Sequence, residues 1–175
     1  VNPNNPTGTV VADAALQEFS ETVTKQCLLL LDEAYTEYSD AQTLAPMVAG
    51  NKNLVIAKTF SKIHGMAGAR VGFVLAHPNT IKQLSNWQPW ANAGPSAVSM
   101  AGATAALTDK QFMDYTRTNN EKVKAMATAA MNQLGIKVIP SHTSFLYYDS
   151  SVIKTNLAEA MAAANIQGIR TYEEG

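Results

Sequence analysis

Residues 55–74 read Val55-Ile-Ala-Lys-Thr-Phe-Ser-Lys-Ile-His-Gly-Met-Ala-Gly-Ala-Arg-Val-Gly-Phe-Val74, and the organisation of the chain follows from them. The apolar start predicts a short buried strand. Two hydroxyls, an amine, a guanidinium and three glycines follow it, at Thr59, Ser61, Lys62, Gly65, Gly68, Arg70 and Gly72. Glycine lets the backbone approach a ligand closely, while hydroxyls and arginine suit phosphate oxygens. The stretch therefore predicts a site for an anionic group.

Two chemical roles are open to Lys62 within this stretch. Its amine is either one more donor to a phosphate or a nucleophile toward an aldehyde. A lysine acts as a nucleophile only when it is neutral, so nearby positive charge and desolvation must lower its pKa. Arg70 would supply such a charge.

Two more polar groups occur upstream. Asn5 lies in the turn-forming sequence of residues 1–8, where its amide serves either the turn or a ligand. The continuous apolar run of residues 27–32 predicts a strand buried on both faces of a parallel sheet. Asp32 ends this run, at the carboxyl end where such sheets bind ligands, although a carboxylate there also suits a helix cap.

The composition limits the class of partner. Charged residues make up 15% of the 175 positions, against about 25% in an average domain, so more surface is hidden in the core or against a partner. The net charge of -1 favours neither nucleic acid nor a membrane surface. No apolar run approaches the roughly 20 residues of a membrane span, and no His, Cys, Asp and Glu cluster has metal-site spacing.

Cys27 is the one cysteine, so an internal disulfide is excluded, and its side chain is predicted to be buried. With no signal peptide visible, we expect a cytoplasmic protein.

Three motifs occur in a specific order along the chain. They are Asn-Pro-Thr-Gly at residues 5–8, Asp-Glu-Ala-Tyr at 32–35, and Ser-Lys followed by Gly-x-x-Gly-x-Arg-x-Gly at 61–72. Together they resemble the fold-type-I pyridoxal-phosphate (PLP) enzymes, aminotransferase class I/II, and are most similar to the histidinol-phosphate aminotransferase branch. The resemblance extends over the whole chain.

The resemblance implies a role for each motif residue. Lys62 would form the Schiff base with the cofactor, and its phosphate would be bound by Thr59, Ser61 and Arg70. Asp32 would keep the pyridine nitrogen protonated, so that the ring acts as an electron sink. The phenolic oxygen of the cofactor would be bound by Asn5 and Tyr35. The family usually has Ala/Ser-Asn-Phe at the turn that here reads Thr143-Ser144-Phe145, so Ser144 stands where the family has an asparagine that helps to seat the substrate.

The expected fold is α/β. Helices are predicted over residues 11–25, 79–88, 95–107, 109–134 and 152–164, and strands over 27–32, 53–59, 70–76, 136–139, 145–148 and 168–172. The apolar helix 95–107 is predicted to be buried all round. By resemblance, residues 1–108 form part of a PLP-binding large domain with a mostly parallel sheet, incomplete at its N-terminal side. Residues 109–175 then form an interdomain helix and part of a smaller α+β C-terminal domain.

The resemblance predicts a PLP-dependent aminotransferase that moves an amino group from an amino acid or a histidinol-phosphate-like donor to a 2-oxo acid. Two alternatives stay open: a related PLP-dependent decarboxylase or lyase, and a non-catalytic PLP-binding regulatory domain. We expect a homodimer with small-molecule substrates. Because the chain begins at Val1 and contains only about the second half of such an enzyme, we also expect it to be a piece of a longer protein.

Overall fold

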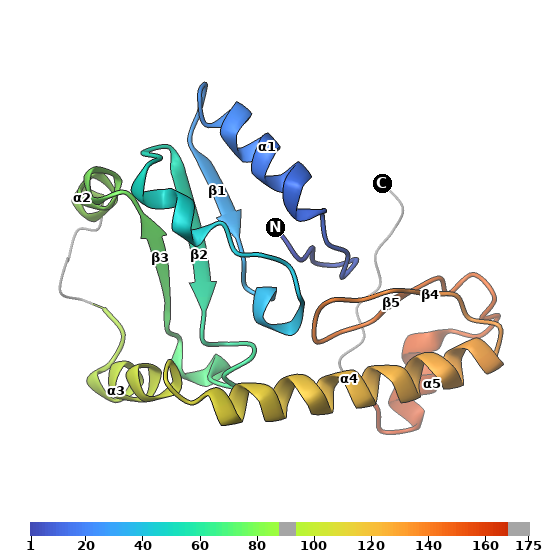
Figure 1. The fold of residues 1–175 in the computed structure, drawn as a ribbon. Helices are drawn as coiled ribbons and strands as arrows, with labels where there is room; N and C mark the ends of the chain where they lie inside the picture. The colour runs from blue at the N-terminus through green and yellow to red at the C-terminus, as the bar shows by residue number, and fades with distance from the viewer. Residues whose placement is uncertain (88–93, 168–175) are drawn as a thin grey trace.

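The computed structural model describes residues 1–87 and 94–167 (Figure 1). Its elements form a three-stranded sheet with its helices, followed by a long helix that leads to a two-stranded sheet. In chain order they are α1 (Asp13–Val23), β1 (Leu29–Asp32), η1 (Thr36–Tyr38), η2 (Ala45–Ala49), β2 (Leu54–Thr59), η3 (Ala67–Ala69), β3 (Gly72–Ala76), α2 (Pro78–Asn86), α3 (Ala97–Ala106), α4 (Lys110–Gln133), β4 (Val138–Ile139), β5 (Tyr147–Tyr148) and α5 (Leu157–Ala163). These confirm the predicted elements to within a few residues, apart from the strand predicted over 168–172, which lies outside the described residues.

The larger sheet has mixed strand directions. β1 pairs with β2 in parallel, with Leu29 opposite Leu54, whereas β2 pairs with β3 antiparallel, with Thr59 opposite Gly72. The described sheet therefore does not confirm the prediction of a mostly parallel one. The reason lies in the connection from β2 to β3, which contains the three-residue η3 and no α-helix that could cross the sheet.

The core of this sheet lies on one face of β1. Leu31 is buried in a cluster with Leu16 of α1 and with residues of β2, whereas Leu30 is 60% exposed. The prediction of a strand buried on both faces is therefore wrong for β1, because no element within the described residues covers the face that carries Leu30. Cys27 is exposed as well, which corrects the prediction of a buried thiol.

Helix α3 also contacts the rest of the molecule along one face. Ala103 packs with Phe60 and Val71 in a buried cluster. Val98 is 83% exposed and Met100 is 49% exposed, so the prediction of a helix buried all round is wrong in the described structure. The helix is apolar, as predicted, but the elements that the structure describes cover one side of it.

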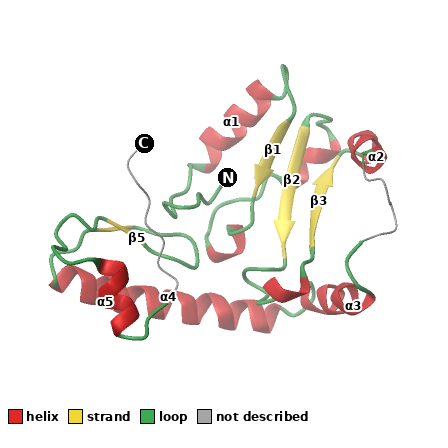
Figure 2. Ribbon diagram, turned by 180° about the vertical axis from the view of Figure 1, so that it is seen from behind, coloured by secondary structure: helices red, strands yellow, loops and turns green. Residues whose placement is uncertain are grey.

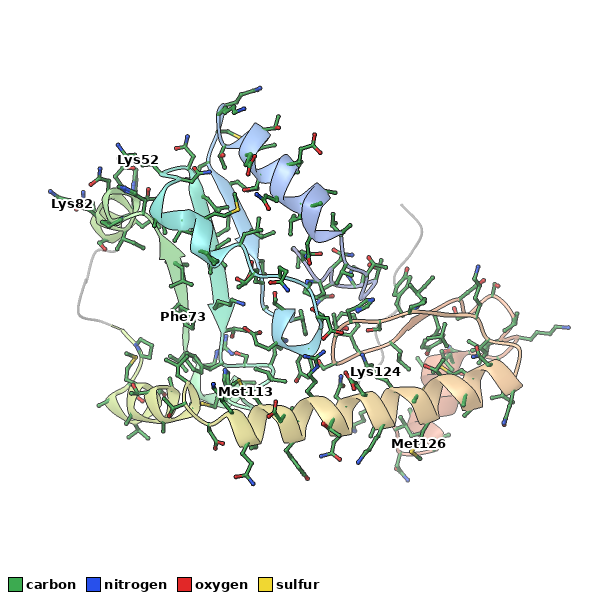
Figure 3. The ribbon with its side chains drawn as sticks, in the orientation of Figure 1. Lys52, Phe73, Lys82, Met113, Lys124 and Met126 are labelled. Carbon is green, nitrogen blue, oxygen red and sulfur yellow. The ribbon has the colours of Figure 1, made fainter. Side chains whose placement is uncertain are left out.

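The 24-residue helix α4 leads from the part of the chain that contains the larger sheet to the small sheet (Figure 2). It contacts both η1 and β4. Asp109 caps its N-terminus by accepting a hydrogen bond from the Phe112 amide at 2.9 Å. The side chain of Lys124 points toward the small sheet and donates to the Ser141 carbonyl at 2.6 Å, while Met126 points away and is 73% exposed (Figure 3). None of the helices within residues 1–87 and 94–167 combines the length and apolarity that a membrane crossing requires.

Gly72 allows the antiparallel pair to form. A Cβ atom at this position would lie 2.8 Å from the carbonyl oxygen of Lys58, which belongs to the backbone of β2 and cannot move aside easily. We expect Gly72→Ala to lower the free energy of unfolding by about 1–3 kcal/mol, the range for overpacking a well-packed site. Urea denaturation of the protein that carries this chain measures the change.

Gly50→Ala is the matched control for this substitution. Gly50 has a φ of −98° and open space around its Cβ position, so the same change there should alter stability by no more than about 0.5 kcal/mol. Equal effects of the two substitutions would contradict the role given to Gly72.

Candidate functional site

The predicted site residues meet at one edge of the larger sheet. Because β1 and β2 are parallel, Asp32 at the end of β1 and Thr59 at the end of β2 lie at the same edge. β3 runs in the opposite direction and begins there, with Gly72 opposite Thr59, so Arg70 comes to this edge from the other side. Figure 1 shows α4 running past this edge. The strand directions thus bring three distant segments of sequence together.

Asn5, Tyr35 and Lys62 form the best-defined part of the site. The Asn5 side-chain amide donates to the Tyr35 hydroxyl at 3.5 Å, and the Lys62 Nζ lies 5.1 Å from the centre of the Tyr35 ring. The ring is 5% exposed and packs edge-on against Phe145, with a centroid distance of 5.3 Å. The Lys62 amine makes no hydrogen bond or ion pair with any residue that the structure describes. It is therefore held over an aromatic face and free to bond to a ligand.

Asp32 anchors the first motif to the second. Its Oδ1 accepts a hydrogen bond from the Ala34 amide at 2.9 Å, which orients the half-buried carboxylate. Its backbone carbonyl accepts a hydrogen bond from the Asn2 amide, also at 2.9 Å. The segment that carries Asn5 is thereby tied to the end of β1.

Thr59 and Ser61 lie at the start of the loop that carries Lys62, and Arg70 lies near its end. Thr59 Oγ1 accepts a hydrogen bond from the Ser61 amide at 3.0 Å. Arg70 has a left-handed backbone, with φ of 51°, and its exposed guanidinium donates to the Ala67 carbonyl at 2.8 Å. No described contact joins Arg70 to Lys62, so the expected effect of Arg70 on the lysine stays a prediction. The three side chains offer a set of hydroxyl and guanidinium donors at one edge.

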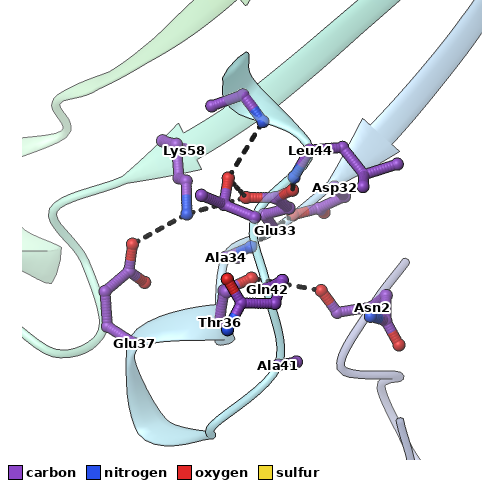
Figure 4. A network of polar contacts seen from close by, with 12 residues as sticks. Asn2, Asp32, Glu33, Ala34, Thr36, Glu37, Ala41, Gln42, Leu44 and Lys58 are labelled. Atoms are coloured by element: carbon purple, nitrogen blue, oxygen red, sulfur yellow. Dashed lines mark hydrogen bonds and ion pairs between the residues drawn. The ribbon is translucent and has the colours of Figure 1, made fainter. Parts of the chain in front are cut away.

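Sequence reasoning missed a buried charge network beside this edge. Lys58 pairs with Glu33 at 2.8 Å and with Glu37 at 2.9 Å (Figure 4). Burial acts to lower the pKa of Lys58, but the hydrogen bonds to the two carboxylates outweigh it and raise the pKa above its ordinary value. A signal was present in the sequence, because Lys58 interrupts an apolar strand and a buried lysine requires a partner.

The turn at residues 141–145 closes the site from the side of the small sheet. Besides the contact of Phe145 with Tyr35, Ser144 hydrogen-bonds the side chain of Tyr38. Burial raises the pKa of Tyr38, and the Ser144 hydrogen bond opposes part of that rise. The His142 amide donates to the Gly8 carbonyl at 2.8 Å, which joins this turn to the motif that contains Asn5. No group of three or more His, Cys, Asp and Glu side chains that could hold a metal ion occurs in the described part of the chain.

The comparison with known families agrees with these motifs. The sequence model of the family described as aminotransferase class I and II matches residues 1–170. The chain belongs to this family. Histidinol-phosphate aminotransferase from Moorella thermoacetica is 38% identical over 152 residues, which cover 85% of this chain and 39% of that enzyme. The corresponding enzyme from Brevibacillus brevis is 34% identical over 171 residues, covering 96% of this chain and 46% of the relative. The chain thus spans less than half the length of these curated relatives.

Solved structures of other enzymes share the fold of this chain. Histidinol-phosphate aminotransferase from Sinorhizobium meliloti, in complex with pyridoxal-5'-phosphate, superposes with a TM-score of 0.79 and 29% identity, covering 86% of this chain and 41% of that one. L-threonine-O-3-phosphate decarboxylase from Porphyromonas gingivalis gives a TM-score of 0.66 and 25% identity, over 81% of this chain and 43% of that one. The fold therefore occurs both in aminotransferases and in a decarboxylase.

We expect His64 to make the folding stability depend on pH. Its ring packs against Phe60 at 5.0 Å, and its Nδ1 is buried with no hydrogen-bond partner among the described residues. Burial lowers the pKa of His64 below 6.5, against an opposing effect of Glu37. The unfolded chain therefore takes up the proton first as the pH falls, so folding stability should decrease as the pH drops through 6.5 toward the lowered value.

We expect His64→Gln to reduce this loss of stability on acidification. Urea unfolding on either side of pH 6.5 tests it, with the exposed His142→Gln as control. The control should retain the full pH dependence of the wild type. An unchanged pH dependence in His64→Gln would show that His64 is not its source.

Proposed function

We propose that the protein carrying this chain is a PLP-dependent aminotransferase. It would move an amino group from an amino acid or a histidinol-phosphate-like donor to a 2-oxo acid. The observation that carries the proposal is the position of the Lys62 amine over the ring of Tyr35, whose hydroxyl contacts Asn5, at the sheet edge where Asp32 ends β1. These four residue types come from three separate segments.

The donors at this edge fit pyridoxal phosphate. The cofactor has a phosphate, an aldehyde beside a phenolic oxygen, and a pyridine nitrogen. The aldehyde requires an amine without a competing ion pair, and Lys62 meets this requirement within the described residues. The phenolic oxygen requires nearby hydrogen-bond donors, such as the Asn5 and Tyr35 pair. The protonated ring nitrogen requires a carboxylate partner, for which Asp32 is available. The phosphate suits hydroxyls and a guanidinium.

Each residue then has a definite task. When bound, pyridoxal phosphate supplies an electron sink for the carbon that carries the substrate amino group. The Lys62 amine would hold the cofactor at its aldehyde, and as a free amine it would accept the α-proton of the substrate as general base. The Asp32 carboxylate would pair with the protonated ring nitrogen. Asn5 and Tyr35 would orient the phenolic oxygen, and Thr59, Ser61 and Arg70 would bind the phosphate.

A decarboxylase is the second candidate. It is supported by the structural similarity to L-threonine-O-3-phosphate decarboxylase. The residues named above activate the cofactor but do not select which bond of the substrate breaks. We place the aminotransferase first because the family and the relatives of higher sequence identity carry that activity in their names.

The same proposal includes a homodimer in the cytoplasm that binds a small amino donor and a 2-oxo acid acceptor. Exposed apolar side chains on α3, such as Val98 at 83%, support a covering surface in the whole protein. That surface would come from a second copy or from other parts of the same polypeptide.

We expect borohydride reduction in the presence of pyridoxal phosphate to attach the cofactor covalently to Lys62. Peptide mass analysis should locate the added mass at this residue in the wild type and find none there in Lys62→Ala. Lys52→Ala, which alters an exposed lysine, should be labelled like the wild type. Absence of label in the wild type, or full labelling of Lys62→Ala, would contradict the proposed site.

Product analysis separates the two candidate reactions. With amino acids and histidinol phosphate offered singly alongside a 2-oxo acid, an aminotransferase should aminate the acceptor. Release of carbon dioxide without amination of the acceptor would instead establish the decarboxylase.

A further inference from the structure

Three charged residues that the proposed mechanism does not use form a network beside the site. Lys58 Nζ lies 2.8 Å from Glu33 Oε2 and 2.9 Å from Glu37 Oε1. The side chains of Glu33 and Lys58 are 2% and 12% exposed. A buried ion pair adds little net stability, because the loss of hydration offsets most of the attraction. The network therefore calls for a role other than stability.

Glu33 and Lys58 are the sequence neighbours of two candidate site residues, Asp32 and Thr59. Adjacent side chains in extended backbone point to opposite faces, so an ion pair on one face fixes the side chains that leave from the other. The backbone also contributes, because the Glu33 amide donates to the Ala57 carbonyl at 3.0 Å. The ends of β1 and β2 are thus joined by both main chain and side chains.

Glu37 connects a third segment to the same lysine. It belongs to η1 and lies two residues after Tyr35, whose ring faces the Lys62 amine at 5.1 Å. Through its bond to Lys58, Glu37 fixes η1 to the end of β2. The ion pair therefore ties the segment that follows Tyr35 to the end of β2.

The Glu33 carboxylate is held in place independently of the lysine. Its Oε1 accepts a hydrogen bond from the Leu44 amide at 2.9 Å, and its Oε2 accepts one from the Thr43 hydroxyl at 2.5 Å. These bonds tie it to the chain just before η2. Lys58 therefore pairs with an anion that has other partners besides it.

We propose that Lys58 is a positioning residue for cofactor binding. By bridging Glu33 and Glu37, it holds the ends of β1 and β2 and the helix η1 in the arrangement that pyridoxal phosphate requires. This inference rests on the proposed function, and it adds a residue that does not itself touch the cofactor.

The test compares the dissociation constant for pyridoxal phosphate among variants of the protein that carries this chain. Lys58→Met leaves the buried Glu33 carboxylate without its counter-ion and should impair folding. The double variant Glu33→Gln/Lys58→Met removes that charge and should remain folded, as circular dichroism would show. Its dissociation constant should rise roughly tenfold or more, as expected when supporting contacts of a site are lost. Lys58→Arg keeps the positive charge and should bind pyridoxal phosphate like the wild type. Lys52→Met, the control at an exposed lysine, should also match the wild type.

Glu37→Gln tests the ion pair between Lys58 and Glu37. It leaves no buried carboxylate unpaired, because the Glu37 side chain is 32% exposed. It should weaken binding while leaving urea stability near that of the wild type. Wild-type affinity in both the folded double variant and Glu37→Gln would overturn this inference, since a purely structural network would give that result. If the wild type itself does not bind pyridoxal phosphate, the proposed function fails instead, and the two failures are distinguishable.

Discussion

The ammonium group of Lys58 lies between the carboxylates of Glu33 and Glu37, with Glu33 almost fully removed from solvent. An unpaired charge at that depth would be strongly unfavourable, so Glu33 and Lys58 must pair where the ends of β1 and β2 meet, and Glu37 adds η1 to this pair. The raised pKa of Lys58 reflects the same constraint, because the two carboxylates outweigh the effect of burial and keep the lysine charged. The rest of the candidate site is arranged around these fixed ends.

The directions of the strands then place the candidate site residues at one edge of the sheet. The parallel β1–β2 pair brings Asp32 and Thr59 to one edge, and the returning β3 brings Arg70 to it, with Gly72 permitting close contact between the strands. The turn after β4 then covers the buried Tyr35 ring with Phe145. Residues from both ends of the chain therefore meet at one edge, although none of the elements alone contains a site.

Much of this could be predicted from sequence, since Asn5, Asp32 and Lys62 stand in motifs whose residue types suit one cofactor, and the helices follow from apolar periodicity. The antiparallel direction of β3 was not predicted, because an apolar run indicates a strand but not its orientation. The exposure of Leu30 on one face of β1 was mispredicted, since a continuous apolar run does not say whether anything covers each face. Lys58 was overlooked because a lone lysine in a strand does not name its partners.

The family assignment and the edge geometry support one candidate binding site, and its most direct test is a crystal structure of the protein with pyridoxal phosphate. The account predicts the phosphate beside Thr59, Ser61 and Arg70, and the ring nitrogen facing Asp32, with Lys62 at the aldehyde carbon. Electron density for the cofactor elsewhere, such as the groove of about 410 Å³ between α4 and the small sheet beside Lys124, would contradict it.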